Sequence, residues 1–248
     1  MTESSSDAAP YCVGPDPSPA PPRQELPPLS CDSHMHICGP ESRYRYAAER
    51  IYTPPDALLT DYLHVATTLG LGRIVFVQPS VYGTDNAAML EAMGLCPLPN
   101  RGVAVIDATV SNDTLHSLHQ AGVRGVRFNL VDVADTTTQL PLEPIKEIAQ
   151  RIEPLGWHVE LLVHVDEYPR LDELLGDISV DIVIGHLGYF PPDRSTRDEG
   201  FQALLRLMLA GRCWTKLTGP YRVSAGKLPY SSVAEFAREL VQQTPDRV

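Results

Sequence analysis

Residues 158–188 read HVELLVHVDEYPRLDELLGDISVDIVIGHLG, and this stretch decides the predicted fold. Two short runs rich in β-branched and apolar residues, 158–164 and 180–185, predict strands, and the amphipathic stretch 167–175 between them predicts a helix. A strand, a helix and a second strand in this order form a β-α-β unit with parallel strands. The continuously apolar run Ile182–Ile184 is typical of a parallel strand that is covered on both faces.

The same pattern repeats along the chain on both sides of this stretch. Further strands are predicted at 30–37, 73–78, 102–107, 122–130 and 213–218, and further helices at 56–69, 84–94, 111–121, 142–155, 197–209 and 231–243. Repeated β-α units fit either an α/β TIM-type (β/α) barrel or an open, doubly wound sheet. No G-x-G-x-x-G follows the first strand, which weakens the dinucleotide-binding version of the open sheet.

Composition excludes several classes of protein. The chain has 248 residues, with 20 Lys and Arg against 31 Asp and Glu, and its net charge of −11 argues against nucleic-acid binding. No stretch approaches the roughly 18 apolar residues of a membrane span. The N-terminus MTESSSDAAP lacks the features of a signal peptide. We therefore expect a cytoplasmic protein that binds no membrane, and the sequence leaves its oligomeric state open.

The first 28 residues differ in composition from the rest. They hold eight of the 23 prolines and few residues that could form a core, which predicts a disordered or extended tail. Residues 29–248 remain for the barrel and contain only seven predicted β-α units. We therefore expect a TIM-type barrel that lacks its eighth strand at the C-terminus.

Histidines gather at the ends of the predicted strands, where a TIM barrel carries its active site. His34 and His36 end the first strand, His164 ends the fifth, and His186 follows the sixth. Two imidazoles on one side of a strand end can hold a divalent metal or polarise a carbonyl group. By strand alternation, Asp32 points the same way as His34 and His36.

Polar residues also occur where a barrel interior is normally apolar. Arg127 and Asn129 share one face of the fourth predicted strand, whereas Arg124 faces the helices. An inward Arg127 needs an anionic partner, either a substrate carboxylate or a neighbouring Asp or Glu in a structural ion pair. Gln78, at the end of the second strand, is a further candidate for substrate contact.

Five motifs together resemble the amidohydrolase superfamily, from about residue 29 to the last residue. They are DSHMH at 32–36, YTPPDA at 52–57, GVRGVRFN at 122–129, PLGWHV at 154–159 and GHLG at 185–188. The resemblance is closest to the superfamily's lactonases, which include the 2-pyrone-4,6-dicarboxylate lactonases. It implies a hydrolase of aromatic catabolism that opens an anionic lactone by attack of water on the ester carbonyl.

The resemblance also implies roles for single residues. His34, His36 and His186 match histidines that surround the scissile carbonyl. Three further residues match side chains that bind the substrate: Tyr52, Arg127 and Arg222.

Two departures from the family concern the substrate and a metal. A second carboxylate-binding arginine is expected a few residues after Arg127, where Val133 or a neighbour stands, and this argues against an unmodified pyrone dicarboxylate. His164 has no counterpart in the pyrone lactonases. With His34, His36 and His186 it could hold one divalent metal such as zinc, as in muconolactone-type lactonases; metal-free catalysis is the alternative.

A third departure concerns the catalytic base. The family continues into an eighth strand and a Gly-Thr-Asp-Trp-Pro motif whose aspartate activates water, whereas Val248 is the last residue here. Asp32 is a poor substitute and is better suited to orienting the histidines. An inactive or small-anion-binding truncated protein therefore stays an alternative to the lactonase, as does a related decarboxylase.

Overall fold

The computed structural model of the chain describes residues 9–132 and 139–248. These residues divide into two compact units. One unit consists of residues 9–105, 120–123 and 132, and the other of residues 106–119, 124–131 and 139–248.

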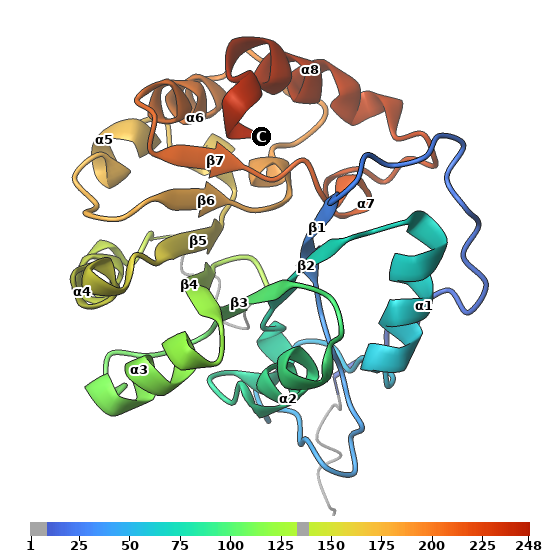
Figure 1. Ribbon diagram of the computed structural model, residues 1–248. Coiled ribbons are helices and arrows are strands. Elements are labelled where there is room, and N and C mark those ends of the chain that lie inside the picture. Colours follow the sequence, from blue (N-terminus) through green and yellow to red (C-terminus); the bar gives the residue numbers. More distant parts are fainter. Residues whose placement is uncertain (1–8, 133–138) are drawn as a thin grey trace, which may run out of the picture. The chain divides into compact units, whose positions relative to one another are not determined.

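The first unit holds three strands that alternate with helices along the chain (Figure 1). Its elements are β1 (Cys31–Met35), α1 (Leu59–Leu69), β2 (Arg73–Val77), a short 3-10 helix (Ser80–Tyr82), α2 (Ala87–Leu95) and β3 (Asn100–Ala104). β1 pairs with β2 and β2 with β3, in both cases in parallel. The alternating residues Ile74 and Phe76 of β2 are buried, which accounts for the apolar run that predicted this strand.

Part of the proline-rich segment pairs with the first unit. Residues 9–12 run extended beside Thr53, whose backbone N–H donates to the Pro10 carbonyl at 2.8 Å and whose carbonyl accepts from the Cys12 N–H at 3.1 Å. The Thr53 hydroxyl also donates to the Ala9 carbonyl at 2.9 Å. These three hydrogen bonds thus join residues 9–12 to the segment that contains Tyr52 and Thr53. A domain boundary near residue 28 stays a prediction.

The second unit contains nearly all of β4 (Val123–Asn129) and the strands that follow it. Its other elements are α3 (Asn112–Gln120), α4 (Leu142–Ile152), β5 (His158–Leu162), α5 (Leu171–Leu175), β6 (Ile182–Ile184), α6 (Glu199–Leu209), β7 (Cys213–Thr215), α7 (Pro220–Val223), α8 (Ala234–Gln243) and short 3-10 helices at Glu153–Leu155, Val165–Glu167, His186–Tyr189, Ser231–Val233 and Pro245–Arg247. The strands pair in parallel in the order β4-β5-β6-β7.

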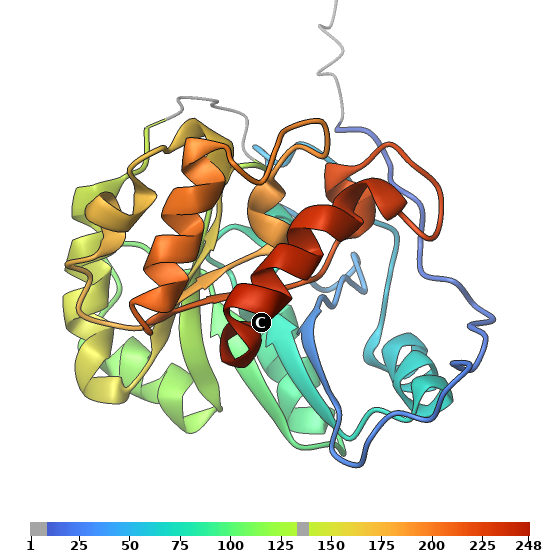
Figure 2. The ribbon, with the colours of Figure 1, turned by 90° about the horizontal axis from the view of Figure 1, so that it is seen from above.

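Helices cover one face of these strands. Figures 1 and 2 show α4, α5 and α6 on the same side of β5, β6 and β7. The buried side chains of α6, among them Phe201, Leu204 and Met208, recur at helical spacing and form its core face. The Asp198 carboxylate accepts from the Gly200 N–H at 2.9 Å and caps the start of α6. The opposite face of the strands is left for the polar side chains of the site.

The structure confirms all seven predicted strands. The predicted helix 167–175 is shorter than expected, because Pro169 separates the 3-10 turn Val165–Glu167 from α5. The helix α7 was not predicted, since four residues are too few to show a helical period. The described residues hold seven strands and no eighth. In the same residues, no helix is both long enough and apolar enough to cross a membrane.

Candidate active site

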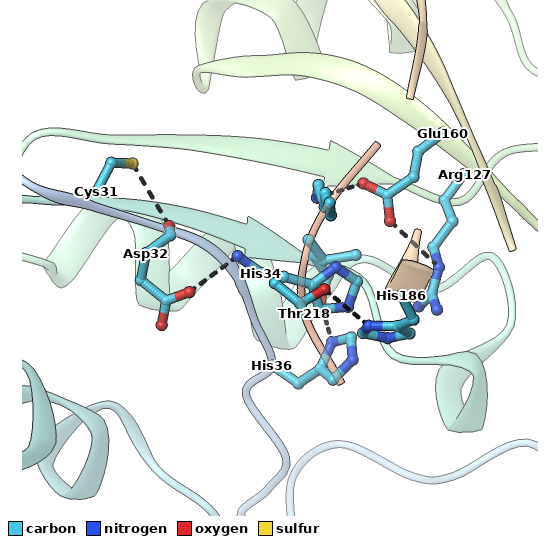
Figure 3. Close-up of polar contacts among 10 residues, drawn as sticks. Cys31, Asp32, His34, His36, Arg127, Glu160, His186 and Thr218 are labelled. Atoms are coloured by element: carbon cyan, nitrogen blue, oxygen red, sulfur yellow. Dashed lines mark hydrogen bonds and ion pairs between the residues drawn. The ribbon is translucent and has the colours of Figure 1, made fainter. Parts of the chain in front are cut away.

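The end of β1 differs from simple strand alternation. Asp32 pairs with Ile74 and Met35 with Phe76, so three steps along β1 match two steps along β2. This extra residue is a bulge, which interrupts the alternation of side chains. The Asp32 carboxylate accepts from the Tyr62 hydroxyl of α1 at 2.8 Å, so the expectation that Asp32 points with both histidines is wrong. Its other oxygen accepts from the His34 backbone N–H at 2.9 Å, which supports the orienting role (Figure 3).

The two histidines of this strand end lie against each other. The rings of His34 and His36 have centroids 4.9 Å apart and meet edge to face. His36 Nδ1 lies 2.7 Å from the Val77 carbonyl oxygen at the end of β2 (Figure 3). Because a carbonyl oxygen only accepts, Nδ1 carries the proton in this contact, and Nε2 is the basic nitrogen of a neutral His36.

Two predicted substrate contacts also belong to the first unit. Gln78 is fully buried, and its amide nitrogen donates to the Asp85 carbonyl at 2.7 Å. Tyr52 is half-buried and packs against a small core cluster that contains Val81 and Tyr82. Their roles toward a substrate stay predictions.

A buried group of charges crosses the interior of the second unit. Arg127 on β4 is 4% exposed and is paired in register with Glu160 on β5, which is 0% exposed. Arg127 Nε lies 3.6 Å from Glu160 Oε1. Lys216 Nζ, just beyond β7, lies 2.6 Å from Glu160 Oε2. The structural ion pair that the sequence left open for Arg127 is therefore present, which leaves its binding of a substrate carboxylate as a proposal.

A glycine makes room in the layer below this group. A Cβ atom added to Gly125 would lie 2.5 Å from the His158 ring, so only glycine leaves space for that imidazole. Gly125 and Arg127 thus face the same side of β4, as the sequence predicted. Arg124 faces the other way, and its guanidinium donates to the His119 carbonyl of α3 at 2.8 Å.

His186 follows β6 in a strained segment. It has φ of 48°, Leu187 has φ of 58° and Tyr189 has φ of 48°, a left-handed conformation that non-glycine residues rarely adopt. Such strain costs about 1–3 kcal/mol per residue and is concentrated at functional sites. A Cβ atom on Gly219 would lie 2.7 Å from His186 Nδ1, so glycine is required there too.

The surroundings of His186 keep its ring neutral. Nδ1 lies 2.9 Å from the Thr218 hydroxyl (Figure 3). Burial lowers the pKa of His186 to about 4, and the positive charges of Arg127 and Arg222 act in the same direction. A neutral imidazole at pH 7 can donate a hydrogen bond through one nitrogen and accept through the other.

Tyr189 joins three predicted site residues. Its ring meets the rings of His164 and His186 edge to face, with centroid distances of 5.3 Å and 5.7 Å. The Arg222 Nε donates to the Tyr189 hydroxyl at 3.0 Å, and the guanidinium lies over the ring at 5.8 Å. Asn129, at the end of β4, accepts from the Val131 N–H at 3.0 Å, an Asx-type turn that ends the strand.

The predicted four-histidine metal set is divided between the units. His34 and His36 belong to the first unit, and His164 and His186 both contact the ring of Tyr189 in the second. Across residues 9–132 and 139–248, no three His, Cys, Asp or Glu side chains gather as a metal site. Neither unit alone brings these four histidines together, and no chemical step is derived through a metal. Val133 lies outside the described residues.

Sequence reasoning missed four residues around this site. Glu160 could have been noticed as the lone carboxylate of the predicted strand 158–164, whose other residues between the two histidines are all apolar. Lys216 and Thr218 share one parity at the end of the seventh predicted strand, the signal that was used for Arg127 on the fourth. Tyr189 carries no such signal, because its place depends on the left-handed backbone of residues 186–189.

Comparison with known proteins gives the family. A family model described as "Amidohydrolase" matches residues 31–248. The chain is 35% identical over 241 residues to a 2-pyrone-4,6-dicarboxylate hydrolase of Comamonas testosteroni, a match that covers 93% of this chain and 78% of that protein. It is 32% identical over 248 residues to a 4-sulfomuconolactone hydrolase of Hydrogenophaga intermedia, which covers 100% of this chain and 82% of the relative.

A solved structure supports both the fold and the family. The crystal structure described as a putative 2-pyrone-4,6-dicarboxylic acid hydrolase of Pseudomonas putida is 35% identical, with a TM-score of 0.71 over 90% of this chain and 79% of that one. With the observed alternation of parallel strands and helices, this likeness confirms the predicted α/β fold class of TIM type. The chain belongs to the amidohydrolase family of enzymes.

Proposed function

We propose that this protein hydrolyses an anionic lactone of aromatic catabolism. The observation that carries the proposal is the position of His186, a buried imidazole that contacts Thr218 and the ring of Tyr189, which also binds Arg222, and on which the charges of Arg127 and Arg222 act. Arginine binds carboxylate or sulfonate groups by charge-assisted hydrogen bonds. The two curated relatives are named as hydrolases of a pyrone dicarboxylate and of a sulfomuconolactone, which are both lactones with anionic substituents.

In the proposed reaction, one set of residues binds the substrate and another activates its ester carbonyl. Arg127 and Arg222, helped by Tyr52, hold the anionic groups, and Asn129 and Gln78 complete the contacts. In this mechanism the Thr218 hydroxyl is the donor to His186 Nδ1, 2.9 Å away, so that the Nε2–H of His186 donates to the lactone carbonyl oxygen and stabilises the oxyanion that forms. Water adds to the carbonyl carbon and gives one proton to the base, the ring C–O bond breaks, and the ring oxygen leaves and takes up that proton. The carboxylic acid that forms from the carbonyl group and the water oxygen then releases its proton to give a carboxylate.

A basic nitrogen is needed to take the proton from water. The resemblance assigns His34 and His36 to the same carbonyl, and the hydrogen bond from His36 Nδ1 to Val77 leaves Nε2 of that ring as the acceptor. Asp32 orients this strand end through the His34 N–H. The zinc-dependent version with His34, His36, His164 and His186 stays an alternative prediction.

A direct assay tests the function. Purified protein is mixed with 2-pyrone-4,6-dicarboxylate or 4-sulfomuconolactone at constant pH, and proton release and ring absorbance are followed with and without a chelator. Acid production supports the lactonase, loss of activity in chelator supports the metal-dependent version, and indifference to chelator supports the metal-free one. Release of CO₂ in place of acid supports the decarboxylase, and no turnover of either lactone contradicts the proposal. The cytoplasm stays the predicted location, and a small anionic lactone the predicted partner.

A further inference from the structure

Glu160 is a buried carboxylate to which the proposed reaction assigns no role. It is the only carboxylate of β5, its exposed fraction is 0%, and both of its oxygens face cations. A buried carboxylate is costly unless partners compensate its charge. Burial raises the pKa of Glu160, but Lys216 and Arg127 outweigh burial and hold it below the usual value. Glu160 is therefore anionic at neutral pH.

The geometry shows which edge of Arg127 faces this anion. Arg127 and Glu160 are register partners on adjacent strands, and their contact runs through Arg127 Nε at 3.6 Å. In Figure 3 the terminal nitrogens of the Arg127 guanidinium lie on the far side from Glu160, toward His186. Arg127 Nε thus faces the anion at ion-pair distance, and the opposite edge of the guanidinium is directed toward His186, a geometry that suits two-point binding of a carboxylate.

Lys216 balances the charge of this arrangement. Its ammonium group lies 2.6 Å from the second oxygen of Glu160, and its side chain is 11% exposed. The charges of Glu160 and Lys216 cancel, so the three side chains together carry the single positive charge of Arg127. That charge matches one carboxylate on the ligand.

We propose that Glu160, supported by Lys216, is a positioning residue that holds Arg127 in the direction of one substrate carboxylate. The proposal rests on the proposed function for the identity of the ligand, but it concerns anion binding and needs no turnover to be tested. Glu160 itself touches no substrate and acts through the guanidinium.

The test uses variants that keep the net charge. The double variant Glu160→Gln/Lys216→Met removes one negative and one positive charge, so a change in anion affinity reflects lost positioning and not altered charge. The variant leaves the buried Arg127 without its anion, which is expected to cost about 3–5 kcal/mol of unfolding free energy, so thermal unfolding checks that the variant is folded. The probe is pyridine-2,4-dicarboxylate, a planar dianion without an ester bond, and its binding is measured by calorimetry.

We expect the double variant to bind this probe about tenfold more weakly than the parent protein. The uncharged pyridine-2,4-dicarboxamide serves as the control ligand, and its affinity should not change. In an Arg127→Met background the same two substitutions should weaken binding of the dicarboxylate no further, because a positioning residue has no effect once its target is absent.

Three results would overturn the proposal. They are parent-like affinity in the double variant, an equal loss in the Arg127→Met background, and absence of Arg127-dependent binding in the parent protein. If the parent chain binds the probe through Arg127 but hydrolyses neither lactone, the proposed function fails and the positioning role stands. If the double variant unfolds, Glu160→Asp, which keeps every charge and withdraws the carboxylate from Arg127 by one methylene group, should weaken binding of the dicarboxylate in the parent chain but not in the Arg127→Met background. Parent-like affinity of Glu160→Asp then contradicts the proposal.

Discussion

The two arginines assigned to the substrate lie in opposite environments of the second unit. Arg127 stands in the middle of β4, is almost fully buried and faces the carboxylate of Glu160. Arg222 stands on the four-residue helix α7, is exposed to solvent, and contacts the hydroxyl and the ring of Tyr189. One guanidinium is held by a buried charge and the other by a neutral phenol.

This difference indicates how each arginine meets an anion. A buried guanidinium is tolerated only with an anionic partner, so Arg127 is fixed before any ligand arrives. An exposed guanidinium keeps its hydration, and a contact with a phenol restrains it only weakly. We infer that Arg127 sets the position of the substrate and that Arg222 contributes to its capture.

The largest effect is expected from Arg127→Met. It removes the cation on one side of Glu160, and breaking a buried pair costs about 3–5 kcal/mol of unfolding free energy. It also removes a charge-assisted contact to the substrate, so kcat/KM for the anionic lactone should fall by about 100-fold or more. Urea unfolding and steady-state kinetics measure the two effects.

Arg124→Met is the matched control on the same strand. Arg124 faces α3 and donates to the His119 carbonyl, so its loss should cost about 1 kcal/mol of stability and leave kcat/KM within about twofold. Equal losses of activity in the two variants would contradict the distinction between the two faces of β4.

The strands that carry both arginines could be predicted, because each is a short apolar run between helix-periodic stretches. The interior direction of Arg127 also followed from parity, since β4 is regular through Gly125 and Arg127. The direction of Asp32 did not follow, because the bulge in β1 is defined by its register with β2 and not by its own residues.

Contacts between side chains of different strands could not be predicted from the sequence for a similar reason. Glu160 carries no motif, and its role depends on register with Arg127 and on Lys216, which is 56 positions away. The place of Arg222 depends on Tyr189, which is reached through a left-handed backbone that no local pattern of His-Leu-Gly-Tyr signals.

The pH dependence of stability reports on the charges near His186. Its pKa is lowered to about 4 in the folded chain, against an unfolded value near 6.5. Between these values the unfolded chain binds more protons, so stability is lost as the pH falls from 6.5 to 4, by about 3 kcal/mol in all. In urea unfolding at pH 7.5 and pH 4.5, His186→Gln should lose less stability than the parent chain.

The same titration sharpens the comparison of the two arginines. After burial, Arg127 is the larger cause of the lowered pKa of His186, and Arg222 is a smaller one. The pKa of His186, followed by NMR, should therefore rise more in Arg127→Met than in Arg222→Met. If the pKa of His186 rose equally in the two variants, or more in Arg222→Met, the charge of Arg222 would act on the His186 ring more strongly than its solvent exposure indicates.

A smaller effect is expected from Arg222→Met. The side chain is exposed, so its removal should change the unfolding free energy by less than about 1 kcal/mol. The KM for the anionic lactone should rise about tenfold with little change in kcat, because a capture contact acts on bound substrate and transition state alike. Arg238→Met, on the exposed face of α8, is the matched control and should leave both constants unchanged.

The smallest effect is expected from Tyr189→Phe, which separates two contacts of Arg222, the one to the hydroxyl and the one to the ring of Tyr189. The variant keeps the ring that contacts His164 and His186 and removes the hydroxyl that accepts from Arg222 Nε. A hydrogen bond of this kind contributes about 0.5–1.5 kcal/mol, so KM should rise about two- to fivefold with kcat unchanged. In an Arg222→Met background the same change should have no effect on KM, because the hydroxyl then has no guanidinium to hold. A fall in kcat in either background would show that the Tyr189 hydroxyl acts on the reaction itself. The contrast between the two arginines would then not account for the effect of Tyr189 on catalysis.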